Sequence, residues 1–236
     1  MNMAMAETPN RAALYRLMAW LSPAYPTGAY SYSHGIEWAV EAGRITDRDS
    51  LRGWIAAILS RGTGRVDGAL LAAAHRAVSA EDAAGLDDIC DFSAAFRSSA
   101  ETALETLAQG SAFLAVTRET WPHPVIDRLA ARAENGVGVA HPVAVGAACA
   151  GHGLALDESV AAYLQAFAAN LISAGMRLVP LGQTDGQRVI AVLEPVVAEA
   201  TSRALKTPLE DLGTAVPMVD LSTMHHETQR TRLFRS

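Results

Sequence analysis

Histidine, cysteine and acidic side chains are the residues of this chain that could bind a metal ion. The adjacent pair His225 and His226 is the best candidate by residue type. Two neighbouring ligands near a chain end, however, need completion from elsewhere in the protein. His34 and Glu37 are one helical turn apart and could hold a divalent ion together, or they could form an exposed polar pair. His225, His226 and His34 are therefore weak metal candidates, and no tightly bound cofactor is expected.

Side chains for catalysis do not form a recognisable motif. Lys206 is the only lysine, and the glycine of a phosphate-binding loop does not precede it. Cys90 and Cys149 lack the spacing of a zinc site or a redox pair, and no Gly-x-Ser-x-Gly sequence occurs. His141 and His152 would stand about 16 Å apart along one helix, so we expect helix caps or core-edge side chains there. The sequence therefore predicts a protein that is not an enzyme.

Composition limits the class of protein further. The chain has 236 residues, 50% of them hydrophobic, which is enough for one good core and favours a single domain. Its net charge of −6 argues against nucleic acid as a partner, because phosphate binding depends on lysine and arginine. No apolar run reaches the length of a membrane span, and Met1 to Asn10 does not resemble a secretion signal. We expect a cytoplasmic protein with no membrane contact.

The elements that must position these residues are all predicted to be helices. Apolar residues recur at helical spacing, and no segment shows sustained period-two alternation. We expect an all-α bundle around a central apolar helix at about 158 to 175, with Asp157 as its cap. A second helix would be capped by Ser31 or Ser33, and a last one would begin at Thr184 or Asp185. The predicted ranges are about 12 to 21, 33 to 41, 47 to 59, 67 to 79, 84 to 97, 99 to 118, 124 to 134, 142 to 151, 158 to 175 and 185 to 204. In terms of domains, this predicts a flexible N-terminus at 1–10, a helical domain at 11–206 and a C-terminal extension at 207–236.

Two internal stretches are typical of recognition surfaces rather than of catalysis. Residues 22 to 37 contain three tyrosines, including Tyr30 and Tyr32, and form either an interface or a loop folded onto its own domain. Residues 177 to 187 join the two strongest helices. Arg177 either caps helix carbonyls or reaches a partner's carboxylate, and Gln183, Asp185 and Gln187 could turn the chain or contact a partner.

The last twelve residues differ from the rest of the chain. They carry a charge of about +2, whereas residues 1–224 carry −8. The few apolar groups of this tail are not expected to order its backbone alone, so it is either a frayed end or a docking segment. In the docking case Leu233 and Phe234 would anchor the tail, and Arg232 and Arg235 would pair with acidic groups of the partner.

These three stretches, in this order and at these separations, resemble the UreF family of urease accessory proteins. The resemblance covers nearly the whole chain from about Leu14. It implies an all-α homodimer that binds a second accessory protein, UreD (also called UreH), and with it recruits the GTPase UreG. The assembly would deliver nickel to apo-urease through a water-filled tunnel, so that nickel transits the complex. The tail would become ordered on the UreD/UreH partner, with the end of the helix at Arg177 in the same contact region.

From the resemblance and the residues together, we expect a non-enzymatic nickel-insertion chaperone that bridges UreD/UreH and UreG. The alternative is a direct nickel carrier that uses the tail histidines. The residues expected to bind partners are Tyr30, Tyr32, Arg177, Gln183, Asp185, Gln187, His226, Glu227, Arg232, Leu233, Phe234 and Arg235.

Overall fold

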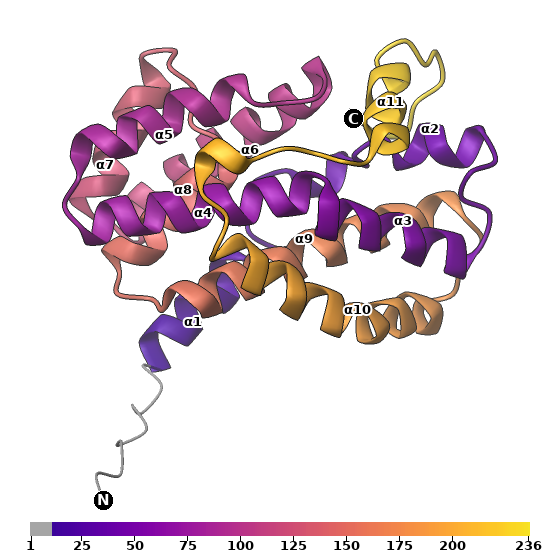
Figure 1. Cartoon of the computed structure of the whole chain (residues 1–236), viewed down its shortest axis with the longest axis horizontal. Coiled ribbons are helices and arrows are strands. Elements are labelled where there is room, and N and C mark those ends of the chain that lie inside the picture. The colour runs from indigo at the N-terminus through magenta and orange to yellow at the C-terminus, as the bar shows by residue number, and fades with distance from the viewer. Residues whose placement is uncertain (1–10) are drawn as a thin grey trace, which may run out of the picture.

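The computed structural model describes residues 11–236, so the expected flexible N-terminus at 1–10 lies outside the described residues. The described residues form helices and connecting loops, without a β-strand among them (Figure 1). The elements are α1 (Arg11–Trp20), η1 (Ala29–Ser31), α2 (Ile36–Glu41), α3 (Arg48–Arg61), α4 (Thr63–Ser79), α5 (Ala83–Ala95), α6 (Ala100–Thr120), α7 (Pro124–Glu134), α8 (His141–Gly151), α9 (Leu156–Leu178), α10 (Gln183–Ala204), η2 (Leu209–Asp211) and α11 (Pro217–His226). The predicted all-α class is confirmed.

The predicted helices are present, but several caps differ from expectation. α2 begins at Ile36 after Gly35, so neither Ser31 nor Ser33 is its N-cap. α9 begins at Leu156, which places Asp157 inside its first turn, and α10 begins at Gln183 after Gly182. Backbone conformation at the residue before each helix decides these boundaries more than the nearest polar side chain does.

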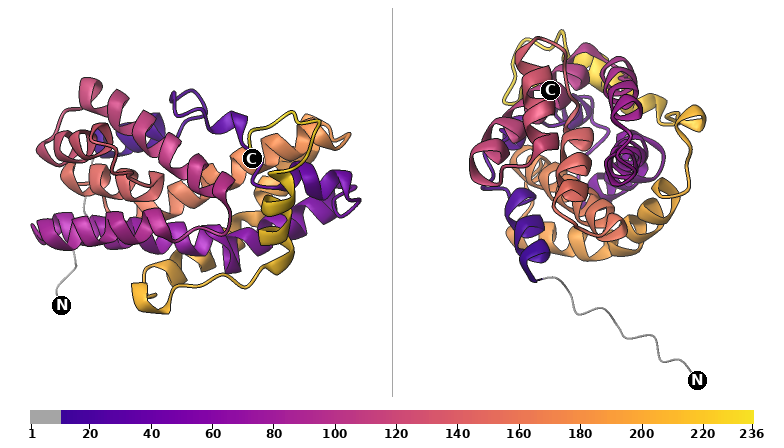
Figure 2. Two further views of the ribbon diagram at one scale, coloured as in Figure 1. Left: turned by 90° about the horizontal axis from the view of Figure 1, so that it is seen from above. Right: turned by 90° about the vertical axis from the view of Figure 1, so that its left-hand side faces the viewer.

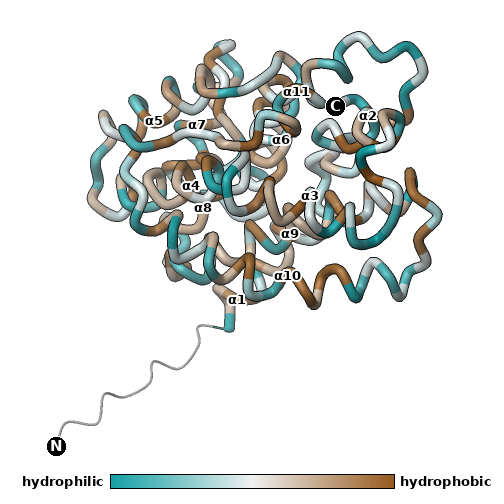
Figure 3. Tube along the Cα trace, turned by 45° about the vertical axis from the view of Figure 1, so that its right-hand side comes forward, coloured by the Kyte–Doolittle hydropathy of each residue, from teal (hydrophilic) through white to brown (hydrophobic). Residues whose placement is uncertain are grey.

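The core lies where α4 and α8 cross, with α9 packed along both. Every residue of α8 from Pro142 to Cys149 is buried, and a Cβ at Gly146 would lie 2.4 Å from the carbonyl oxygen of Leu71. A glycine at this position therefore lets the two helix backbones approach closely. α9 is the expected central apolar helix, and it packs against α2, α3, α4, α8 and α10. In Figure 3, hydrophobic positions recur along the helices, whereas the loop after α11 is coloured mostly as hydrophilic.

After α10 the chain crosses the face of α4 to reach α11, which lies beside α2 (Figures 1 and 2). Arginine side chains hold this connection: Arg76 donates to the Leu205 carbonyl at 2.6 Å, and Arg65 donates to the Asp211 carbonyl at 3.1 Å. The connection thus brings the last twenty residues next to α2 and α6, far from them in sequence. Within residues 11–236, no helix is both long enough and apolar enough to cross a bilayer.

Candidate partner-binding site

The C-terminal segment is folded against the body of the protein. The few apolar groups of the last twelve residues, 225–236, were not expected to order this tail alone, and in the structure polar contacts add to them. The amide of Arg235 donates to the carbonyl of Ser31 at 2.8 Å, and the amide of Ser33 donates to the carbonyl of Ser236 at 2.7 Å. These backbone hydrogen bonds tie the end of the chain to the loop before α2.

Glu37, in the first turn of α2, is the central acceptor for the tail. Its carboxylate accepts from the amide of Leu233 at 2.6 Å and from the amide of Phe234 at 2.9 Å. The same carboxylate lies 3.1 Å from Nε2 of His226. Hydrogen bonds to a charged acceptor are stronger than neutral ones, and Glu37 is buried, so this group fixes the path of the tail.

Two further carboxylates, both on α6, contact the tail. Glu101 lies 2.7 Å from Nδ1 of His226 and accepts from Arg232 at 2.6 Å. Glu105 accepts from the Ser236 hydroxyl at 2.8 Å. Glu101 and Glu105 are one turn apart, so α6 presents both to the tail from one face. Of the tail arginines, Arg232 thus pairs with a carboxylate of its own chain.

Phe234 is the buried anchor of the segment. Only 3% of the residue is exposed, and the guanidinium carbon of Arg177 lies 4.2 Å from the centre of its ring, in a cation–π contact. Arg177 also donates to the carbonyl of Tyr30 at 2.8 Å and to that of Ser173 at 3.3 Å. Burial lowers the pKa of Arg177. Of the two expectations for Arg177, the capping of its own helix is observed, and its contact with Phe234 was not foreseen.

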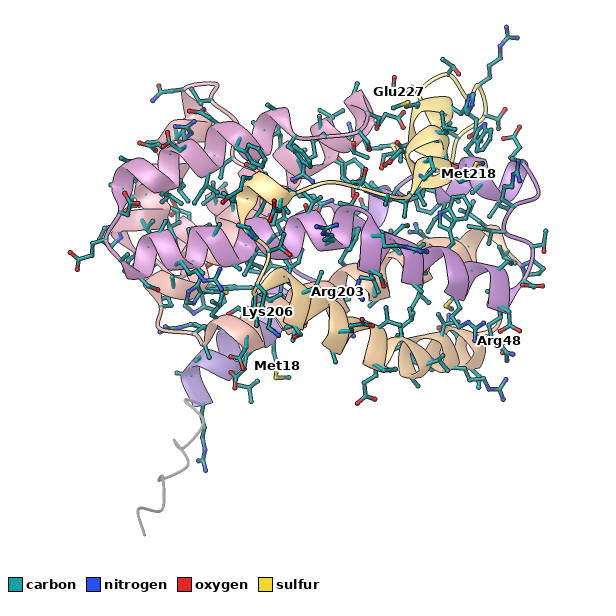
Figure 4. All side chains as sticks on the ribbon, in the orientation of Figure 1. Met18, Arg48, Arg203, Lys206, Met218 and Glu227 are labelled. Carbon is teal, nitrogen blue, oxygen red and sulfur yellow. The ribbon has the colours of Figure 1, made fainter. Side chains whose placement is uncertain are left out.

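Several large apolar side chains of this region are exposed. Leu233 is 64% exposed and Tyr30 is 68% exposed. On α11, Met218, Leu221 and Met224 recur every three residues and are also exposed. Figure 4 labels Met218 near the start of α11 and Glu227 just after its end. We refer to Tyr30, Met218, Leu221, Met224 and Leu233 as the outer face of the tail.

A glycine sets how closely α11 approaches α2. Gly35 has a φ of +75°, and a Cβ there would lie 2.9 Å from the backbone nitrogen of Thr223. His34, just before it, also has a positive φ, of 55°. Two successive left-handed residues reverse the chain, so that α2 and α11 meet without an intervening side chain.

The other predicted site residues lie in different surroundings. Tyr32 is buried, and burial raises its pKa, while the positive charge of Arg235 lowers it. Glu227 accepts from the amide of Ala100 at 2.9 Å. Gln183, Asp185 and Gln187 lie in the first turns of α10, where Asp185 pairs with Arg188 at 3.0 Å. Among the described residues, no hydrogen bond or ion pair joins these three to the tail.

The three metal candidates are not brought together as ligands. His225 stacks on Trp38, with ring centroids 4.7 Å apart, and His226 lies between two carboxylates. His34 contacts the hydroxyl of Thr63 at 2.8 Å, and its Nδ1 lies 3.5 Å from Glu105. In residues 11–236, no group of three or more histidine, cysteine or acidic side chains is arranged to hold a metal ion.

A partly open pocket of about 170 Å³ adjoins this region, and Tyr30 is among its lining residues. Its polar lining includes His34, Asp67, Arg97, Glu105, His141 and Tyr163. Arg97 donates to Asp67 at 2.8 Å, and the hydroxyl of Tyr163 donates to the same carboxylate at 3.0 Å. Burial lowers the pKa of His141 to about 4 and raises that of Tyr163 well above its usual range. Glu105 belongs to both the pocket and the tail contacts.

Sequence reasoning missed the roles of three acidic residues. Glu37 was expected only as a partner of His34, and neither Glu101 nor Glu105 was expected at the site. One signal was available: Glu101, Glu105 and Gln109 follow one another at four-residue steps in a predicted helix, which places a polar stripe on one face. Nothing in the local sequence, however, indicates that this stripe faces the end of the chain.

The fold and the site define an all-α protein whose C-terminal segment closes onto two of its own helices, α2 and α6. The family model named UreF matches residues 45–194. The urease accessory protein UreF of Granulibacter bethesdensis (strain ATCC BAA-1260 / CGDNIH1) is 55% identical over 225 residues, which cover 95% of this chain and 94% of the relative. The proteins of the same name from Rhodopseudomonas palustris (strain BisB5) and Bradyrhizobium sp. (strain ORS 278) are 53% and 50% identical, each covering 95% of this chain and 92% of the relative.

This chain belongs to the UreF family of urease accessory proteins. The resemblance noted from its three sequence stretches is therefore confirmed. Membership of the family makes it an accessory protein of urease maturation rather than the catalytic urease itself.

Proposed function

We propose that this protein bridges UreD/UreH and the GTPase UreG, and that it supports GTP-dependent delivery of nickel to apo-urease. The observation that carries the proposal is the outer face of the tail. The folded segment buries Phe234 and leaves Leu233 exposed, and exposed apolar side chains beside a buried anchor are typical of protein interfaces. UreD/UreH is the partner proposed for this face, and the protein would act as a homodimer in the cytoplasm.

The folded tail changes how the docking would work. Phe234, Arg232 and Arg235 were expected to reach into the partner, but Phe234 and Arg232 are already engaged by Arg177 and Glu101. In the proposal they build the docking face, and Leu233 with the α11 methionines contacts the partner. A preorganised face lowers the entropic cost of association, because the segment is already ordered when the partner arrives.

The partly open pocket supports the nickel part of the proposal. Its lining contains polar groups, including Asp67, Glu105 and His34, that a passing ion could contact, although the described residues hold no group of three or more metal ligands. Because Glu105 also contacts the tail, an ion in the pocket would lie next to the surface proposed for UreD/UreH. Nickel would be the cargo that transits the complex, not a resident cofactor of this chain.

The contacts of the tail histidines do not favour the alternative of a direct nickel carrier. Both ring nitrogens of His226 face carboxylate oxygens, and the ring of His225 covers Trp38. A carrier site built from this pair would have to release these contacts first.

Co-purification with UreD/UreH tests the docking face. The variant Leu233→Asp places a charge on the outer face without removing a buried contact, and Val137→Asp is the matched control, since Val137 is exposed in the loop before α8. Leu233→Asp and deletion of 227–236 should each abolish co-purification, whereas Val137→Asp should retain it. Normal co-purification of Leu233→Asp would overturn the proposal.

A further inference from the structure

Arg97, in the loop between α5 and α6, is buried with two of its nitrogens unsatisfied. Its side chain is only 6% exposed, and Nη1 donates to Asp67 at 2.8 Å. Nε and Nη2 are buried as well, and no group within residues 11–236 accepts a hydrogen bond from either. Buried N–H groups of a charged side chain cost free energy when they lack an acceptor. These two nitrogens are therefore donors that a ligand could engage.

The two unsatisfied nitrogens form one edge of the guanidinium group. The N–H of Nε and one N–H of Nη2 lie in the guanidinium plane and point in the same direction, so together they match the two oxygens of a carboxylate. Asp67 accepts from Nη1 and does not use this edge. The free edge of Arg97 therefore fits a planar oxyanion that binds through two parallel hydrogen bonds.

Arg97 also lines a second pocket, of about 210 Å³, whose chemistry suits an anion. Hydroxyl groups of Thr63, Ser98, Thr102 and Thr214 belong to its lining. Among the described residues that line it, Arg97 alone is charged. The partly open pocket beside the tail differs in this respect, because carboxylates belong to its lining. An anion in the second pocket would thus meet a cation and hydroxyl donors without facing a like charge.

The start of α6 adds to the preference for negative charge. Ser99 is the N-cap of this helix, and its hydroxyl accepts from the amide of Thr102 at 3.2 Å. Since Thr102 lines the second pocket, the positive end of the helix dipole lies next to it. Glu227 accepts from the amide of Ala100 at the same helix end, but Glu227 is not part of the lining.

Charge and shape narrow the class of anion. Because Arg97 already pairs with Asp67, a singly charged ligand leaves a smaller uncompensated charge at this largely buried site than a phosphate dianion does. The rest of the lining is apolar and includes Val66, Ala95 and Phe96. A guanidinium edge beside an apolar wall suits a carboxylate that carries a short hydrocarbon chain.

We propose that the second pocket is a binding site for a small monocarboxylate. Nε and Nη2 of Arg97 hold its two oxygens, and its hydrocarbon chain lies against Val66 and Phe96. The bound ligand braces loop 96–99 and with it the start of α6. This site goes beyond the proposed function, since it involves neither the outer face of the tail nor a partner protein.

Titration of the full-length protein with sodium propionate, at constant ionic strength and without any partner, tests the proposal. The NMR signals of the Arg97 Nε–H group and of the Thr102 backbone amide report on the pocket. Both signals should shift and saturate with propionate. Propionamide has the same shape without the charge and should leave both unchanged, and inorganic phosphate should bind more weakly. The absence of a saturable shift, an equal shift with propionamide, or tighter binding of phosphate would overturn the proposal.

Arg97→Lys tests the role of the guanidinium edge. Lysine keeps a positive charge opposite Asp67 but cannot offer two parallel N–H groups in one plane. The affinity for propionate, read from the Thr102 amide, should fall by at least about tenfold. Arg118→Lys is the matched control, because Arg118 is exposed and pairs with Asp127 and Glu134. This control should bind propionate as the wild type does, and equal affinities of the two variants would overturn the site.

A second pair of variants leaves Arg97 in place and so does not disturb its ion pair. Ser98→Glu tethers a carboxylate in the lining of the pocket and should prevent propionate from binding. Ser98→Gln has nearly the same size without the charge and should still bind it. Circular dichroism should show unchanged helical content in both. Unchanged binding in Ser98→Glu, or an equal loss of binding in Ser98→Gln, would contradict the proposed site.

Discussion

Leu233 and Phe234 are neighbours in sequence, yet their side chains face opposite environments: Phe234 is 3% exposed under Arg177, whereas Leu233 is 64% exposed. Their consecutive amides both donate to the carboxylate of Glu37, which holds the backbone in this orientation. One residue therefore fixes the segment and the other is free for a partner. Substitutions at the two positions should have different consequences.

Phe234→Ala should open the tail. Removal of a buried phenylalanine typically costs about 3–5 kcal/mol, and the cation–π contact with Arg177 is lost with it. Amide protection in residues 227–236 should fall by at least a hundredfold, and co-purification with UreD/UreH should fall with it. Leu233→Ala should leave protection unchanged and reduce co-purification only. Equal effects of both variants on protection would contradict the assignment of their roles.

Gly35→Ala tests the close approach of α2 and α11. A non-glycine residue at a left-handed φ costs about 1–2 kcal/mol, and the new methyl group would in addition collide with the backbone at Thr223. Gly28→Ala is the control, because Gly28 has the same φ of +75° with nothing within 4 Å of its Cβ position. Urea unfolding should show a larger loss of stability for Gly35→Ala. Equal losses would mean that contact with α11 is unimportant.

The buried ion pair of Asp67 and Arg97 should be essential to the stability of the core. Both side chains are 6% exposed, and Tyr163 also donates to Asp67. Asp67→Asn leaves the guanidinium without a counter-charge, for which a cost of about 3–5 kcal/mol is expected. Asp91→Asn, which removes an exposed partner of Arg132, should cost less than about 1 kcal/mol. Chemical denaturation of both variants tests this prediction: the midpoint should fall much further for Asp67→Asn than for Asp91→Asn, and equal shifts would contradict it.

His141 should make the folded protein less stable in acid. Burial lowers its pKa to about 4 in the folded state, whereas an unfolded histidine has a pKa near 6.5. The unfolded chain therefore binds the proton first, so this contribution is complete above about pH 6.5 and is lost as pH falls toward 4. The loss amounts to about 2 kcal/mol between pH 7.5 and pH 5. Urea titrations at both pH values should show a smaller difference for His141→Gln than for the wild type, and an unchanged difference would contradict the assignment.

Much of the fold was predictable because a helix is indicated by a pattern among residues that are close in sequence. Apolar spacing and proline breaks located most of the helices, including α7 with Pro124 at its start. α11 was missed, since its exposed methionines and leucine lie on the outer side and do not form the stripe of a core-facing helix. A sequence pattern reveals a helix through the face that it buries.

The site was predictable only in part. The tail, the tyrosine loop and Arg177 were selected from the sequence as unusual, but their contacts with one another were not foreseen. Glu37 and Glu101 lie more than 120 residues before His226, and pairing at such a distance has no signature in a single sequence. The basic segment was therefore interpreted as a ligand of an acidic partner protein. In the structure, carboxylates on α2 and α6 of the same chain contact it instead.

The nickel content of urease, measured after co-expression of the urease structural and accessory genes, tests the central claim most directly. With wild-type protein or Val137→Asp, the purified urease should carry its full complement of nickel. With Leu233→Asp, or without this chain, the urease should remain largely free of nickel while its amount stays the same. Full nickel loading in the presence of Leu233→Asp would contradict the claim that the outer face of the tail delivers this protein to its partner.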